Sequence, residues 1–79
     1  MRRTGVAADY AVLGVLAAGG LLTVKQLARE ASVTSWSARA AVSRLEASGL
    51  IVDTRRQGRW EITQRGRGEW AVKGKRFTL

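Results

Sequence analysis

The chain has 79 residues and a formal net charge of +8, and it contains no cysteine and no histidine. These absences exclude disulfide bonds, thiolate metal sites and the commonest general base, and the six carboxylates are too scattered to form a catalytic pair. We therefore expect one small domain over residues 1–79, flexible at 1–6 and 73–79, that is not an enzyme and binds no cofactor or metal.

The positive charge is concentrated in the second half of the chain. Ten of the fourteen lysine and arginine residues lie from Arg39 onward. A strongly basic chain favours a polyanionic partner, which means DNA, RNA or an anionic membrane. Because the charge is clustered rather than spread evenly, we interpret it as a binding footprint and not as a merely soluble surface.

A first helix is predicted over residues 7–18. Asp9 lies in its first turn, where a carboxylate interacts favourably with the helix dipole. Gly19 and Gly20 end the helix, because glycine adopts the left-handed conformation that a helix C-terminus favours. The apolar stripe of this helix, with spacings of three and four residues, comprises Leu13, Leu16 and Ala17.

The apolar run AVLGVLAAGGLL follows Arg2 and Arg3, which gives the N-terminal segment some features of a secretory signal peptide. Cleavage there would delete a core helix, so we favour the helix and expect a cytoplasmic, nucleoid-associated protein. The run is too short to span a bilayer, and no membrane partner is expected.

Two further helices are predicted with a short polar turn between them. Thr23 and Gln26 fit a capping box, so the second helix is expected over Val24–Ala31. Thr34 fits the N-cap of a third helix, residues 34–48, which ends at a glycine. Two helices joined in this way form a helix-turn-helix.

The third helix has two different faces. Its buried face, with i, i+3, i+4, i+7 spacing, comprises Ala38, Ala41, Val42 and Leu45. The opposite face comprises Trp36, Ala40, Ser43 and Ala47. Arg39 and Arg44 flank this second face. Its small residues permit close approach to a major groove, and its arginines can reach phosphates or guanine edges.

A basic β-hairpin is predicted after the third helix. Its wing, residues 53–61, lies within the runs LIVDTRR and RWEIT, and Gly58 supplies the positive φ that the turn needs. Trp60 and Ile62 alternate with Glu61, so we expect both to pack on one face as core residues.

The last predicted element is a short helix over residues 64–73. Thr63 can cap it, and Gly66 and Gly68 weaken it. We expect Trp70 to pack in the core.

The order helix, helix, turn, helix and basic hairpin resembles the winged helix-turn-helix family. The stretch LAREASVTSWSARAAVSRLEASGLI, residues 27–51, is similar to the signature of that family. ITQRGR, residues 62–67, resembles the LTxxGR motif that follows the wing in MarR- and PadR-like regulators. The resemblance implies a mainly α fold with a small β-hairpin: a three-helix core, a wing and a short C-terminal helix. Such regulators usually carry a long additional dimerisation helix, whereas this chain ends twelve residues after Arg67.

The resemblance and the charge together predict a sequence-specific double-stranded DNA-binding protein, in the default case a transcriptional repressor. The third helix is expected in the major groove and the wing on the backbone or in the minor groove. Three alternatives stay open: a phage- or plasmid-type factor for excision, replication, partition or transfer; a DNA-recognition module of a larger protein; and a winged-helix protein-docking module. RNA binding is less favoured, because few aromatic side chains are available for stacking.

The predicted DNA contacts fall into three groups. Those from the recognition helix are Thr34, Ser35, Trp36, Ser37, Arg39, Ala40, Ser43 and Arg44. Those from the wing are Arg55, Arg56, Gln57, Gly58 and Arg59. The flanking contacts are Lys25, Arg65 and Arg67.

Individual side chains allow more than one interpretation. Trp36 can contact DNA, pack on a partner subunit or fold back onto the second helix. Arg39 can bind a guanine bidentately or form an ion pair with Glu46 or Glu30, and Arg44 is expected on a backbone phosphate.

One monomer would read about a half-site, so a homodimer or a cooperative oligomer on DNA is expected. The candidate subunit contacts are Val12, Val15, Trp70 and Phe77.

Overall fold

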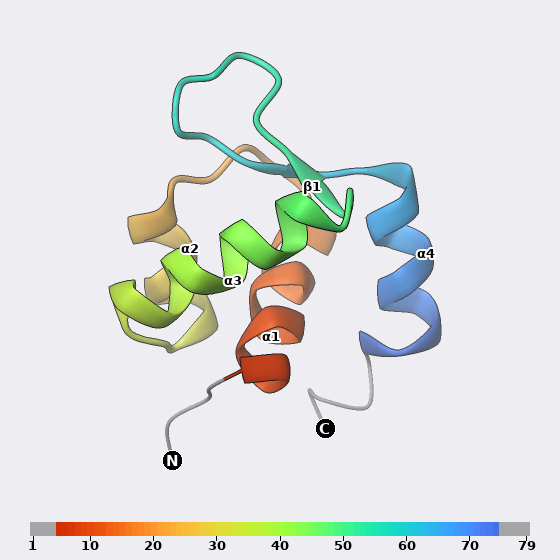
Figure 1. Ribbon diagram of the computed structural model, residues 1–79, viewed down its shortest axis with the longest axis horizontal. Helices are drawn as coiled ribbons and strands as arrows, with labels where there is room; N and C mark the ends of the chain where they lie inside the picture. Colours follow the sequence, from red (N-terminus) through yellow and green to blue (C-terminus); the bar gives the residue numbers. More distant parts are fainter. Residues whose placement is uncertain (1–4, 75–79) are drawn as a thin grey trace.

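The computed structural model describes residues 5–74, and these form four helices and one two-stranded antiparallel sheet (Figure 1). In chain order the elements are α1 (Gly5–Ala17), α2 (Val24–Ala31), α3 (Ser35–Ala47), β1 (Ile51–Val52), β2 (Glu61–Ile62) and α4 (Gln64–Val72). This order confirms the predicted winged helix-turn-helix. Within the described residues no helix has both the length and the apolar character needed to cross a membrane.

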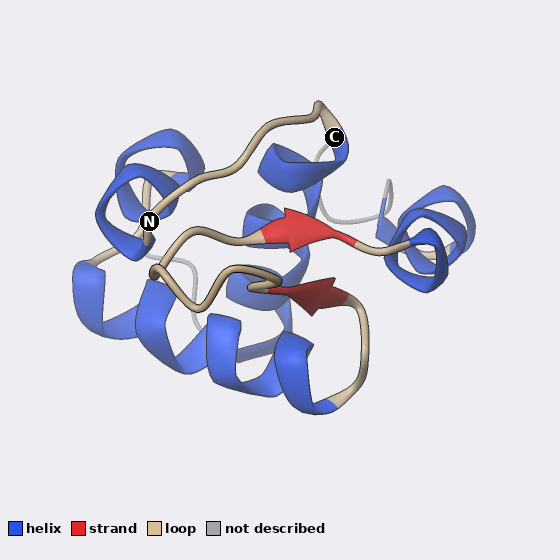
Figure 2. Ribbon diagram, turned by 90° about the horizontal axis from the view of Figure 1, so that it is seen from above, coloured by secondary structure: helices blue, strands red, loops and turns tan. Residues whose placement is uncertain are grey.

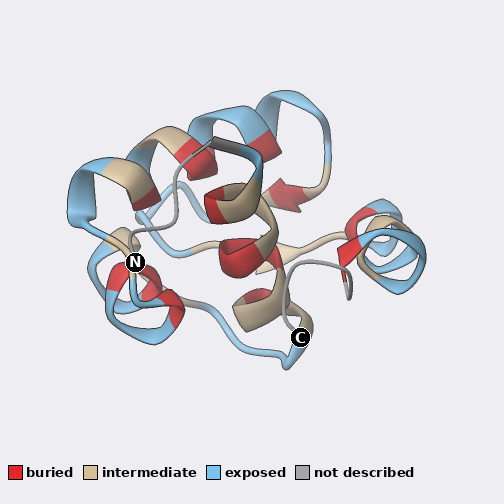
Figure 3. Ribbon diagram, turned by 90° about the horizontal axis from the view of Figure 1, so that it is seen from below, coloured by how far each residue is buried: buried red, intermediate tan, exposed pale blue. Residues whose placement is uncertain are grey.

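Helix α1 runs through the centre of the molecule, and the other three helices lie around it (Figures 1 and 3). It begins at Gly5, two residues earlier than predicted, so Asp9 lies beyond its first turn. The prediction of a single apolar stripe was too narrow, because Val12 and Leu13 are both fully buried although they point to different sides. Val12 is therefore a core residue, and its prediction as a subunit contact is wrong.

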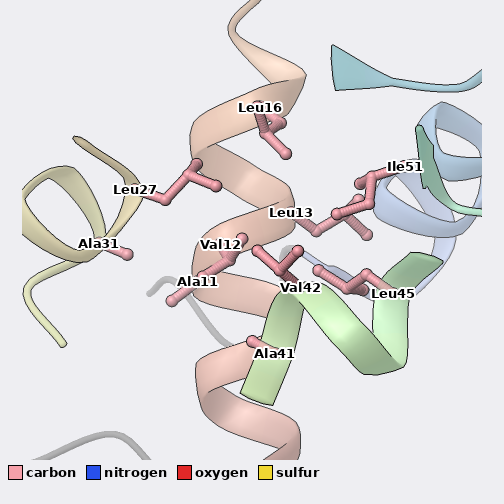
Figure 4. Packing of buried hydrophobic residues seen from close by; sticks show 10 residues of the cluster. All are labelled: Ala11, Val12, Leu13, Leu16, Leu27, Ala31, Ala41, Val42, Leu45 and Ile51. Atoms are coloured by element: carbon pink, nitrogen blue, oxygen red, sulfur yellow. The ribbon is translucent and has the colours of Figure 1, made fainter. Parts of the chain in front are cut away.

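The hydrophobic core is assembled around α1 from several elements (Figure 4). Leu27 of α2 packs on one side of α1, while Val42 and Leu45 of α3 and Ile51 of β1 pack on another. The largest of these side chains are almost fully buried. Truncating a buried leucine to alanine in such a core costs about 2–5 kcal/mol, so this packing accounts for much of the stability of a domain this small.

The predicted N-caps are present in all three cases. Thr23 and Gln26 form a complete capping box at α2. The Thr34 hydroxyl accepts a hydrogen bond from the Ser37 amide at 3.0 Å, and Thr63 caps α4 in the same way. These caps fix where each helix begins, and they set the short turn that places α3 against α2.

The wing is held at its base by backbone pairing. Ile51 pairs with Ile62 and Val52 pairs with Glu61. Leu22 adds a third segment to the sheet, because its amide and carbonyl exchange hydrogen bonds of 3.0 and 2.8 Å with Trp60. Trp60 and Ile62 pack against the core, as the sequence predicted.

Helix α4 is attached closely to the end of α3 and to α1. Gly66 is buried, and a Cβ atom placed on it would overlap the carbonyl oxygen of Leu50. The Thr63 hydroxyl donates a hydrogen bond of 3.0 Å to the same carbonyl oxygen of Leu50. Trp70 packs across Gly14 of α1, which confirms its predicted core role.

A second attachment of α4 is polar. The Tyr10 hydroxyl of α1 donates a hydrogen bond of 2.6 Å to Glu69 Oε2, and Lys73 lies 3.6 Å from the same oxygen. The hydrogen bond to Glu69 raises the pKa of Tyr10 to about 12. It also lowers the pKa of Glu69 below its usual range.

The two glycines within α4 provide a test of the close approach to Leu50. Gly66→Ala should lower the free energy of unfolding by about 1–3 kcal/mol, because the added methyl group overpacks against backbone. Gly68→Ala is the matched control, since a Cβ there meets nothing within 4 Å. It should raise stability by about 0.5–1 kcal/mol through helix propensity. Urea denaturation of both variants measures this, and equal stability would contradict the described packing.

The attachment of α4 by Tyr10 predicts a pH dependence. The raised pKa of Tyr10 means that its stabilising contribution is complete below pH 10, the value for an unfolded tyrosine, and is lost as the pH rises towards about 12. Tyr10 is the sole tyrosine of the chain, so phenolate absorbance titrates it directly. Glu69→Gln should return its pKa towards 10. A wild-type pKa near 10 in protein that circular dichroism shows to be folded would refute the contact.

Candidate nucleic-acid interface

Helix α3 presents a narrow, mostly small outer face. Ala38, Ala41, Val42 and Leu45 are buried, as predicted, and the opposite side is open to solvent (Figure 3). Trp36 heads this open side with 82% of its surface exposed. The alternative that Trp36 folds back onto α2 is therefore wrong. Ser35 and Ser43 are exposed, whereas Ser37 and Ala40 are half-buried.

Arg39 projects from the middle of α3 and is exposed. Among residues 5–74 it forms no ion pair, so the described contacts give no support to the alternative of a bridge to Glu46 or Glu30. Its guanidinium keeps all of its donors available for an external acceptor. Bidentate donation to a guanine edge is the recognition chemistry that this side chain suits best.

Arg44 has a different environment from Arg39. Its Nε and Nη2 atoms donate to both carboxylate oxygens of Asp9 at 2.7–3.0 Å. This hydrogen bonding raises the pKa of Arg44 above its already high ordinary value. The Arg44 side chain is 48% exposed, so the pair contributes no more than about 1 kcal/mol to stability. It nevertheless directs the guanidinium towards α1, and a phosphate would have to compete with Asp9.

The wing loop, residues 53–60, rises from the end of the sheet (Figure 1). Seen from above, it points back towards the N-terminal half of α3 (Figure 2). The residues predicted to bind DNA from this loop are all exposed: Arg55, Arg56, Gln57, Gly58 and Arg59. The loop therefore places three guanidinium groups in solvent.

Asp53 organises this loop, and the sequence analysis did not single it out. Its carboxylate oxygens accept hydrogen bonds from the amides of Gln57 at 3.1 Å and Gly58 at 2.7 Å. Arg56 adopts a left-handed conformation with φ +53°, and Gly58 adopts φ +72°. The signal was present in the sequence, because aspartate at the start of a turn and glycine near its end are typical of this geometry.

The flanking basic residues divide into two kinds. Lys25 lies exposed in the first turn of α2, and Arg65 is exposed in the first turn of α4. Arg67 instead donates from Nη1 to the Ala17 carbonyl at 3.2 Å. It therefore caps the C-terminus of α1, where a cation also interacts favourably with the helix dipole.

An open cleft of about 590 Å³ lies between α1, α3 and α4. Its polar lining includes the Asp9–Arg44 pair, the Tyr10–Glu69 pair and Arg65. Among residues 5–74 no three histidine, cysteine, aspartate or glutamate side chains are grouped as metal ligands. The Asp9 and Arg44 side chains in this lining are bonded to each other, as are those of Tyr10 and Glu69.

Solved structures share this fold. A MarR family transcriptional regulator from Silicibacter pomeroyi superimposes with a TM-score of 0.77 and 27% identity over 91% of this chain and 51% of its own. A MarR family protein of Mycobacterium tuberculosis gives 0.72 and 27% over 89% and 51%. Ligand-free NadR gives 0.72 and 25% over 90% and 53%. The chain thus spans about half the length of these relatives.

No curated protein matches the chain at a significant level of similarity. The family comparison is positive, because residues 4–59 match the MarR family, and this is more than half of the chain. The match includes the helix-turn-helix and most of the wing, which are the parts whose geometry is described above. The chain therefore belongs to the MarR family.

Proposed function

We propose that this protein is a small transcriptional regulator that binds double-stranded DNA and represses by occupying its site. The observation that carries the proposal is the exposed pair Trp36 and Arg39 on a slim helix face beside a wing with three exposed arginines. The MarR membership supports it. A cytoplasmic, nucleoid-associated location follows from this function.

The outer face of α3 suits the major groove. Small side chains such as Ser43 and Ala47 allow the helix axis to approach the base edges closely. Trp36 is the most exposed large hydrophobic side chain within residues 5–74, and tryptophan is enriched at interfaces because its ring is apolar and its N–H can donate. We propose that its ring packs against a thymine methyl group or that its indole N–H donates to a phosphate, while Arg39 reads a guanine.

The wing suits the flanking backbone. Its three arginines are too exposed to stabilise the fold, and guanidinium groups bind phosphates or a narrow A·T-rich minor groove. We do not include Arg44 and Arg67 in the interface, because Asp9 and the Ala17 carbonyl already occupy them. Lys25 and Arg65 remain proposed flanking contacts.

We propose further that two copies bind together. A single recognition helix reads only about a half-site, and a pseudo-palindromic site is the usual solution for two symmetric copies. Members of the MarR family are typically dimers, which supports this arrangement. Phe77, one predicted subunit contact, lies outside the described residues, and Val15 and Trp70 are half-buried against the core.

The wing is tested by replacing Arg55, Arg56 and Arg59 with alanine. Affinity should fall for every duplex, and the slope of log K against log salt should flatten by up to about 0.9 for each lost phosphate contact. Fluorescence anisotropy over a salt series measures both quantities. Arg67→Ala is the control and should leave the slope unchanged. If the wing variant altered sequence preference alone, the proposed division between helix and wing would be wrong.

The recognition helix is tested by selection from random-sequence duplexes. Wild-type protein should enrich a short motif, and Arg39→Ala should lose about 1–3 kcal/mol of discrimination at one base pair. Arg44→Ala, on the same helix, is the matched control and should keep the motif.

Trp36→Ala should also weaken enrichment of the motif. Absence of any salt-sensitive binding would refute the DNA-binding function and favour a protein-docking module with Trp36 at its interface.

A further inference from the structure

We infer that Asp53 is the positioning residue of the wing, and that its carboxylate holds the loop in the shape that presents Arg55, Arg56 and Arg59 to DNA. The inference rests on the proposed function and deepens it. It concerns a residue that carries the wrong charge for DNA binding, so composition and charge would not select it.

The loop has little else to hold it. The strands are only two residues long, and the pairing of Trp60 with Leu22 is the last backbone bridge before the loop. Side chains from residue 54 to residue 59 are all exposed, so no apolar burial orders the loop. A contact between Thr54 and Glu61 at 3.4 Å is long for a hydrogen bond between oxygens.

Asp53 supplies the remaining order. Its backbone carbonyl accepts from the Arg56 amide at 3.2 Å, and its carboxylate accepts from the Gln57 and Gly58 amides. Three amides of the loop therefore point at one residue. The left-handed conformations of Arg56 and Gly58 turn successive N–H groups inwards, which is the geometry of a backbone anion nest. Here the anion belongs to the chain itself.

This arrangement lowers the cost of binding. A loose loop must be ordered when its arginines engage phosphates, and that ordering subtracts from affinity. A loop already closed on Asp53 holds the backbone of its arginines in place before DNA binds. Residues 54–59 of the loop stay exposed in this arrangement.

Electrostatics and positioning predict opposite effects for the removal of this carboxylate. A negative charge beside three arginines repels DNA, so charge alone predicts tighter binding when it is removed. Positioning predicts weaker binding, because the loop loses two of its hydrogen bonds. The sign of the effect therefore separates the two explanations.

The test compares Asp53→Ala, Asp53→Asn and Glu61→Gln in the full chain, using the duplex selected by wild-type protein. All three variants remove one negative charge from the same hairpin, and Glu61→Gln keeps an acceptor for Thr54. Asp53→Ala should bind roughly tenfold more weakly than wild type, with a flatter salt slope. The affinity of Asp53→Asn should lie between those of Asp53→Ala and wild type, since the side-chain amide has one oxygen to accept hydrogen bonds where the carboxylate has two. Glu61→Gln should bind as tightly as wild type or more tightly.

A double-mutant cycle shows whether Asp53 acts through the arginines. In a background with Arg55, Arg56 and Arg59 replaced by alanine, Asp53→Ala should have no further effect on affinity. A full effect in that background would overturn the inference, as would Asp53→Ala binding at least as tightly as Glu61→Gln. If wild-type protein shows no salt-sensitive DNA binding, the proposed function fails and the inference falls with it.

Discussion

The burial of α1 on several sides is the constraint on which the other elements depend. Helices α2, α3 and α4 and strand β2 all pack against it, and its small residues Ala8, Ala11 and Gly14 let neighbours approach closely. Both α3 and strand β2 of the wing pack against α1, and β1 also contacts α3. These contacts set the orientation of α3 relative to the wing.

Arginines in this protein serve two separate purposes. Arg44 and Arg67 bond to acceptors on α1 that lie 35 and 50 residues away in the chain, and so tie distant segments together. Arg39 and the wing arginines lack such acceptors within residues 5–74. A net charge of +8 thus overstates the charge available to a polyanion. Within the part of the chain that the structure describes, the exposed arginines without such an acceptor include Arg39 on α3 and the three arginines of the wing.

Local patterns in the sequence predicted the local structure well. The caps at Thr23, Thr34 and Thr63 and the buried face of α3 depend on residues three to seven positions apart, and all are confirmed. The burial of α1 was underestimated, because periodicity describes one helix and not the number of neighbours that cover it. The hydrogen bonds of Arg44 and Arg67 are made to partners far along the chain, which no local pattern reveals. Asp53 was missed because a search for basic DNA contacts passes over an acidic residue.

The two faces of α3 are independent of each other, and this has a consequence for how the protein can change. The core side comprises Ala38, Ala41, Val42 and Leu45, while the outer positions 36, 39 and 43 contribute nothing to that packing. Substitutions at such exposed positions usually alter stability by less than about 0.5 kcal/mol. A lineage can therefore exchange outer residues one at a time, and so change the surface that α3 offers to a partner, while the scaffold stays folded throughout.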